Sequence, residues 1–259
     1  MNTTDRHIAS AFDRDLETVQ ALVVKMGGLV ETAIDEAARA LETRDDELAE
    51  EVRRRDRAID ALEQQINEEA ARVIALRAPN ATDLRVVLTV IKISGSLERV
   101  GDYAKNIAKR THVLSHLPAI DGAGMALRRM SGTVETMLKD ALDSYVHRDA
   151  ALAADVRARD LEVDQMYNAL FREFLTYMME DPRNITSCMH LHFIAKNIER
   201  MGDRATSIAE QVLYLVSGTL PEDARPKSDS VARPPVDVPV DPAADPEAGP
   251  APRPTPGAG

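Results

Sequence analysis

The sequence contains an internal repeat, and this repeat restricts the possible folds more than any other feature of the chain. With an offset of 104 residues, 15 of the 41 positions from 26 to 66 are identical to those from 130 to 170. Further along, Glu98–Ala108 matches Glu199–Ala209 with an offset of 101. Self-similarity at a fixed offset is typical of proteins built from copies of one unit. We therefore expect two copies of a single small domain.

Each copy is predicted to consist of helices. Apolar residues return every three or four positions, as in Val52, Ile59, Leu62 and Ile66, which is the period of an α-helix. Breaks in this pattern fall near 44–46, 79, 117–124, 147–149 and 182–184. The chain is thus expected to be all-α, with two tandem three-helix bundles made of six long antiparallel helices. Asn80 and Asn184 follow prolines closely and are predicted to cap the next helix.

These breaks divide the chain into three predicted regions. The first repeat covers 1–117, the second covers 118–218, and a tail covers 219–259. Of the 14 prolines, 11 lie after Leu220, and the tail has no aromatic residue. A segment with so little apolar surface does not compensate for the entropy lost on ordering, so we expect the tail to be disordered.

Charge and composition exclude several classes of protein. The formal net charge is −11, which argues against a nucleic-acid partner. A single cysteine excludes an internal disulfide and a zinc site with several cysteines. The first residues do not resemble a signal peptide, and no apolar run is long enough for membrane insertion. We expect a soluble, cytoplasmic protein.

Pairs of carboxylates at spacing i, i+4 recur at matching positions of the two repeats. A helix places such residues on one face. One such pair carries little information, because a chain with 43 acidic residues contains several by chance. Their recurrence is what indicates a role. The four pairs are Asp56/Asp60 and Glu98/Asp102 in the first repeat, and Asp160/Asp164 and Glu199/Asp203 in the second.

Two interpretations of these acids stay open. Converging carboxylates need compensation by cations, and oxygen-only clusters suit metal ions such as Fe, Zn, Mn or Mg. Asn106, one turn beyond Asp102, adds a further candidate ligand in the first repeat. Alternatively, Arg99 and Arg200 neutralise the acids in an ion-pair network. We favour the metal interpretation.

Other polar and glycine positions have less specific interpretations. Gly101 and Gly202 lie within helical patterns, where glycine is unfavourable, and indicate close approach of another helix or of a ligand. We favour helix packing. His112 and His116 are spaced i, i+4 near a predicted helix end. An interaction with the helix dipole and a zinc site both fit this spacing, and we favour the dipole.

The sequence resembles the PhoU family of regulators of phosphate uptake. The resemblance is carried by Arg77–Ala108 and Asn184–Gly218, with support from Arg53–Ile66, and extends over about residues 8–218. Its most specific element is the doubled E-R-x-G-D motif, at Glu98–Asp102 and Glu199–Asp203. The second motif departs from the family pattern, because Arg204 and Ser207 stand where His and Asn are usual.

The resemblance implies two three-helix bundles side by side, with metal clusters on the four acid pairs. It also implies a cytoplasmic, homodimeric protein that is not an enzyme. Such a protein couples the ATPase subunit of the phosphate ABC transporter to a phosphate-sensing histidine kinase, restrains phosphate uptake and represses the phosphate-starvation response. A metal-dependent hydrolase and a purely structural helical scaffold are the alternatives.

Overall fold

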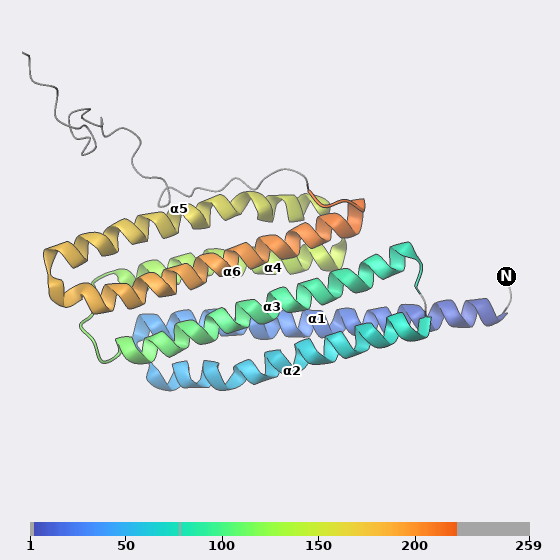
Figure 1. The fold of residues 1–259 in the computed structure, drawn as a ribbon, viewed down its shortest axis with the longest axis horizontal. Helices are drawn as coiled ribbons and strands as arrows, with labels where there is room; N and C mark the ends of the chain where they lie inside the picture. The colour runs from blue at the N-terminus through green and yellow to red at the C-terminus, as the bar shows by residue number, and fades with distance from the viewer. Residues whose placement is uncertain (1–2, 78, 222–259) are drawn as a thin grey trace, which may run out of the picture. The chain divides into compact units, whose positions relative to one another are not determined.

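Six α-helices make up the residues that the computed structural model describes, which are 3–77 and 79–221 (Figure 1). In chain order they are α1 (Thr3–Thr43), α2 (Asp46–Arg77), α3 (Ala81–Leu114), α4 (Ala123–His147), α5 (Ala150–Glu180) and α6 (Ile185–Ser217), with a 3-10 turn η1 (Pro182–Asn184) before α6. No strand occurs within these ranges, so the predicted all-α class is confirmed. The predicted tail lies outside the described residues from position 222 onward.

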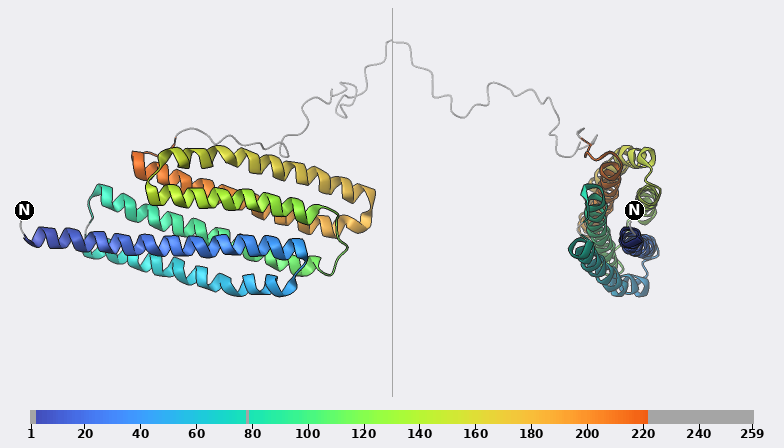
Figure 2. Two further views of the ribbon diagram at one scale, coloured as in Figure 1. Left: turned by 180° about the vertical axis from the view of Figure 1, so that it is seen from behind. Right: turned by 90° about the vertical axis from the view of Figure 1, so that its right-hand side faces the viewer.

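The helices form two three-helix bundles that lie side by side. Helices α1, α2 and α3 pack against one another, and α4, α5 and α6 do the same. The two bundles meet where α1 contacts α4 and α3 contacts α6, while α2 and α5 lie at opposite edges (Figures 1 and 2). None of the described helices has a stretch that is both long and apolar enough to cross a membrane.

One cluster of buried apolar side chains runs through both bundles. It joins Val23 and Met26 of α1 to Val134 and Leu138 of α4, and it continues into α2, α3, α5 and α6. Alanine, valine, leucine, isoleucine and methionine fill most of it. Burial of this surface is the main favourable contribution to folding. Because the core is continuous, the two repeats stabilise each other.

The turns between α1 and α2 and between α4 and α5 have the same construction. Arg44 and Arg148 have left-handed backbones, with φ of 56° and 53°. In each turn the aspartate that follows then caps the next helix: Asp45 Oδ1 accepts from the backbone N–H of Leu48, and Asp149 Oδ1 accepts from that of Leu152. The repeated Arg-Asp dipeptide therefore encodes a repeated helix–turn–helix connection.

One of the two predicted asparagine caps is confirmed and the other is wrong. Asn80 Oδ1 accepts from the backbone N–H groups of Thr82 and Asp83 at 3.0 and 3.1 Å. Asn184 makes no side-chain cap and instead donates to the Tyr177 carbonyl. The cap is displaced because Pro182 starts a 3-10 turn, and Asp181 accepts from the first free N–H of that turn, at Arg183.

Candidate functional site

The acid pairs of the first repeat meet across α2 and α3, and Lys105 lies between them. Its ammonium donates to Asp56 Oδ2 on α2 and, at 3.1 Å, to Asp102 Oδ1 on α3. The Asp56 side chain is buried, with an exposure of 5%, whereas Asp102 is half-buried. The hydrogen bond to Asp56 raises the pKa of Lys105 above its ordinary value, so this lysine stays charged.

The other two acids of this cluster experience the same crowding of negative charge. Partial burial, followed by repulsion from Asp56, raises the pKa of Asp60. Partial burial, followed by repulsion from Asp102, raises the pKa of Glu98. Each of these carboxylates therefore favours binding of a cation or of a proton more than an isolated one does. Asn106 is exposed, and no side-chain hydrogen bond links it to a described carboxylate.

The second cluster is assembled in the same way from α5 and α6. Asp160 and Glu199 are buried, with exposures of 3% and 8%, and Asp164 and Asp203 are half-buried. Glu199 Oε1 accepts from Lys196 at 2.8 Å. Burial still raises the pKa of Glu199, and repulsion from Asp203 and Asp164 adds to the effect. The second cluster is thus the more deeply buried of the two.

Two glycines allow the acid-bearing helices to approach each other. A Cβ at Gly101 would lie 3.0 Å from Ile59 and 3.6 Å from Asp56 Oδ1. A Cβ at Gly202 would lie 3.3 Å from Val163 and 3.6 Å from Asp160 Oδ1. The interpretation of these glycines as helix-packing positions is therefore confirmed. The same contact also places the backbone of α3 or α6 beside a buried carboxylate.

The ion-pair alternative applies to part of each cluster. Arg99 contacts Glu98 at 3.4 Å and Asp102 at 3.5 Å, but it is exposed, so these pairs contribute little. Arg200 is exposed and forms no ion pair with a carboxylate among the described residues. Lys105 and Lys196 also contact the acids, and neither was expected from the sequence. Their i, i+3 spacing from Asp102 and Glu199 was the available signal.

Two observations bear on whether the clusters fit a metal ion. Within the described part of the chain, Asp56 Oδ1 and Glu199 Oε2 are buried acceptors without a hydrogen-bond partner. Buried acceptors of this kind are unfavourable unless a cation or a donor satisfies them. The donors are all oxygens from two facing helices, a set that suits hard or borderline cations. Metal ions therefore fit the donor chemistry of both clusters.

A metal ion in the first cluster would compete with Lys105 for the same carboxylates. Within the described ranges, the single group of three histidine, cysteine or acidic side chains whose ligand atoms all lie within 4.8 Å of one another is Asp46, His112 and His116. The acid clusters are more open than this. Closure of the carboxylates of the first cluster around an ion would displace the ammonium of Lys105 from Asp56 and Asp102.

Comparison with known proteins identifies close relatives. The PhoU domain family matches the chain twice, at residues 23–111 and 127–212. The phosphate-specific transport system accessory protein PhoU homolog of Zymomonas mobilis is 48% identical over 85% of this chain and 93% of that protein. The corresponding protein of Rhizobium meliloti is 45% identical over 86% of this chain and 94% of its own length.

Solved structures show the same fold. The crystal structure of PhoU from Pseudomonas aeruginosa aligns with a TM-score of 0.78 at 39% identity, covering 80% of this chain and all (100%) of that one. The crystal structure of the phosphate transport system regulatory protein PhoU from Streptococcus pneumoniae aligns with a TM-score of 0.76 at 30% identity. The alignment covers 82% of this chain and 100% of that one. Both family matches lie inside the two predicted repeats, whose outer boundaries stay predictions.

Proposed function

Because the chain belongs to the PhoU family, we propose that it regulates phosphate transport as a negative regulator of uptake and of the phosphate-starvation response. In this proposal it is an adaptor between the ATPase subunit of the phosphate ABC transporter and a phosphate-sensing histidine kinase. It acts in the cytoplasm, as a homodimer and without catalysis. The relatives are described as accessory proteins of the phosphate-specific transport system, which supports a role in phosphate transport.

One structural observation carries the proposal: the E-R-x-G-D motif occurs on both α3 and α6, and in both places it faces a buried aspartate of the neighbouring helix. Asp56 lies beside Gly101, and Asp160 lies beside Gly202. Two similar acid clusters in two packed repeats favour a pair of matching cation-binding sites. They do not resemble a nucleophile with its general base, which is an argument for an adaptor rather than an enzyme.

We further propose that both clusters hold divalent or trivalent metal ions, with Fe, Zn, Mn and Mg as candidates. The ligands would be Asp56, Asp60, Glu98 and Asp102 in the first repeat, with Asn106 as an additional oxygen, and Asp160, Asp164, Glu199 and Asp203 in the second. A bound ion would supply positive charge to carboxylates that repel one another. The unpartnered Asp56 Oδ1 and Glu199 Oε2 support this assignment.

The test of the adaptor role uses the full-length chain in its own host. Deletion of the gene is expected to raise alkaline phosphatase expression in phosphate-rich medium, and the wild-type gene is expected to restore repression. A tagged wild-type chain from the same cells is expected to capture the transporter ATPase or the kinase. Unchanged phosphatase expression in the deletion strain would refute the regulatory role.

Variants then test the clusters separately from the fold. Asp56→Asn and Asp102→Asn keep the size of each side chain and remove its charge. Glu173→Gln is the matched control, because Glu173 is an exposed acid of α5 outside both clusters. We expect the first two variants to bind less metal and to repress poorly, and the control to behave as wild type. Normal metal content in both aspartate variants would refute the metal assignment while leaving the adaptor role intact.

A further inference from the structure

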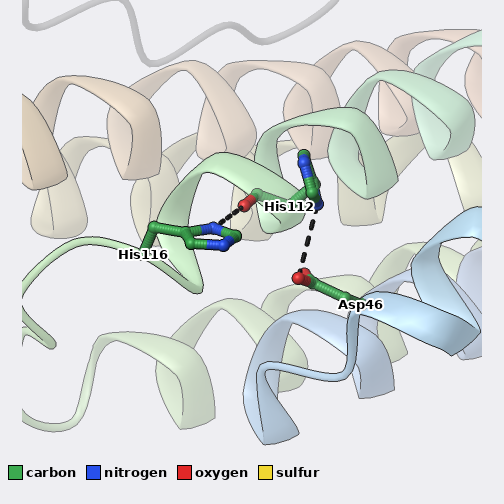
Figure 3. Close-up of side chains that lie close together, drawn as sticks. All are labelled: Asp46, His112 and His116. Atoms are coloured by element: carbon green, nitrogen blue, oxygen red, sulfur yellow. Dashed lines mark hydrogen bonds and ion pairs between the residues drawn. The ribbon is translucent and has the colours of Figure 1, made fainter.

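Asp46, His112 and His116 form a compact cluster where α2 begins and α3 ends (Figure 3). One ligand atom from each of the three side chains lies within 4.8 Å of the other two. His112 Nδ1 is 3.3 Å from Asp46 Oδ2, and the two imidazole rings lie 5.3 Å apart between centroids. This cluster is separate from both acid clusters and uses none of their residues.

Neighbouring groups hold this cluster in place. Ser115 Oγ donates to Asp46 Oδ2 at 3.0 Å, which fixes the orientation of the carboxylate. The guanidinium of Arg44 donates to the carbonyls of Leu114 and Leu117, which ties the end of α3 to the turn that precedes Asp46. Hydrogen bonds that orient a ligand in this way are typical of metal sites.

One acceptor in the cluster lacks a partner. Asp46 Oδ1 is buried, and no donor among the described residues reaches it. Asp46 and His112 also help to line an open recess of about 300 Å³. The charged side chains around this recess are Glu47, Glu50 and Arg53, so its surroundings carry more negative than positive charge. A cation bound by Asp46 and His112 would therefore lie in favourable surroundings and would have room for a further ligand.

We propose that Asp46, His112 and His116 bind a Zn²⁺ ion. His112 lies in the last turn of α3, His116 lies four positions later just beyond the end of that helix, and Asp46 begins α2. Zn²⁺ favours two imidazoles and a carboxylate as ligands, whereas Mg²⁺ and Ca²⁺ do not. Ligands about 2.0–2.2 Å from a tetrahedral ion lie roughly 3.3–3.6 Å apart. Side-chain rotations that move the ligand atoms by about 1 Å bring the cluster to that spacing. The fourth position remains for water or an exchangeable ligand.

The second repeat shows that this cluster is not a general property of the fold. The positions that correspond to the three ligands are Ala150, Leu213 and Ser217, and none of them can bind zinc. His147, at the end of α4, makes the same contact with a preceding carbonyl as His116 does, at 2.9 Å in each case. His147 belongs to no such group within the described ranges. His147 is therefore a suitable control, because it is a histidine at a helix end without the other two ligands.

The experiment titrates Zn²⁺ into chelator-treated full-length protein labelled with ¹⁵N in its histidine rings. The chain has six histidines, and the acid clusters contain none, so ring signals report on the proposed site even if zinc also enters the acid clusters. We expect the ring signals of His112 and His116, assigned by their absence in His112→Ala and His116→Ala, to change together as zinc is added. His147→Ala is expected to bind as wild type does.

Asp46→Asn tests the carboxylate ligand, with circular dichroism as a check of folding. We expect it to weaken zinc binding at least tenfold, and Ser115→Ala, which removes an orienting hydrogen bond, to weaken it by roughly tenfold. Zinc that leaves the signals of His112 and His116 unchanged would refute the proposal. So would binding that is equally tight in wild type and in Asp46→Asn, because the histidines would then act without the carboxylate.

Discussion

Arg44 and Arg148 occupy corresponding left-handed positions in the two helix–turn–helix connections, but their side chains have different roles. The Arg44 guanidinium bonds the carbonyls at the end of α3, whereas Arg148 is exposed. A left-handed backbone costs a residue other than glycine roughly 1–2 kcal/mol. The same substitution at the two positions therefore separates backbone strain from side-chain bonding.

We expect Arg148→Gly to stabilise the protein by on the order of 0.5 kcal/mol, because glycine relieves the strain but increases the entropy of the unfolded chain. Arg44→Gly relieves the same strain and loses two charge-assisted hydrogen bonds, so it should destabilise by about 1–2 kcal/mol. Urea unfolding of both variants measures the difference. Equal effects at the two positions would show that the Arg44 bonds do not contribute.

Lys105→Gln is expected to destabilise the metal-free protein by on the order of 1 kcal/mol, because Asp56 then stays buried without its cation. A divalent metal ion should bind this variant more tightly than wild type, because it no longer competes with an ammonium. Thermal unfolding in chelator and in excess Mn²⁺ measures both effects. Lys109→Gln, an exposed lysine one turn further along α3, is the control. Equal metal affinity in Lys105→Gln and wild type would contradict competition at this cluster.

Glu199 makes the stability of the metal-free protein depend on pH. Burial raises its pKa in the folded state, so the folded protein holds this proton more tightly than the unfolded chain. The contribution of Glu199 to stability is therefore most favourable at pH values below the pKa that Glu199 has in the unfolded chain. This contribution falls as the pH rises through the pKa that Glu199 has in the folded state. Glu199→Gln removes this dependence, so its stability relative to wild type should increase with pH.

Urea unfolding in chelator from pH 4 to pH 8 measures this difference, with Glu173→Gln as an exposed control. A constant difference between Glu199→Gln and wild type across this range would show that Lys196 fully compensates for the burial of Glu199.

Glycine-to-alanine substitutions should have opposite signs at packed and open positions. Gly28 and Gly132 have nothing within 4 Å of an added Cβ, so alanine should stabilise each helix by roughly 0.5–1 kcal/mol. Gly101→Ala forces the Ile59 side chain to move, because the added Cβ lies 3.0 Å from its Cδ1, and should destabilise by about 1 kcal/mol.

Ile59→Val removes the atom nearest to the added Cβ, and it should reduce the cost of Gly101→Ala in a double-mutant cycle. A cycle with no coupling between the two positions would mean that α2 and α3 separate to accommodate the methyl group.

Most of the fold could be predicted from the repeat and from the helical period. The breaks near 44–46 and 147–149 and the Asn80 cap follow from local residue preferences, and the recurrence of Gly101 as Gly202 favoured a packing role over a ligand. The position of the Asn184 cap could not be predicted from the proline alone, because Asp181 and Asn184 were both available and a 3-10 turn decided between them. Competition of this kind depends on backbone geometry.

The acid residues of the candidate site could be selected by recurrence. The pairs Lys105–Asp102 and Lys196–Glu199 could be expected from their i, i+3 spacing within one helix. The bond from Lys105 to Asp56 could not, because it depends on how closely α2 approaches α3. The grouping of Asp46 with His112 and His116 joins residues 66 or more positions apart. It depends on which helix ends meet, which the spacing of the two histidines does not encode.

The contact of α1 with α4 and of α3 with α6 has a consequence for the history of this chain. A half-length ancestor would have presented the same apolar seam to water, and pairing of two copies would have covered it. Fusion of two such copies would make that pairing permanent. Each half of such a fused chain covers apolar surface of the other, so we expect neither to fold alone, whereas surface residues such as those at 46, 112 and 116 are free to differ between the halves.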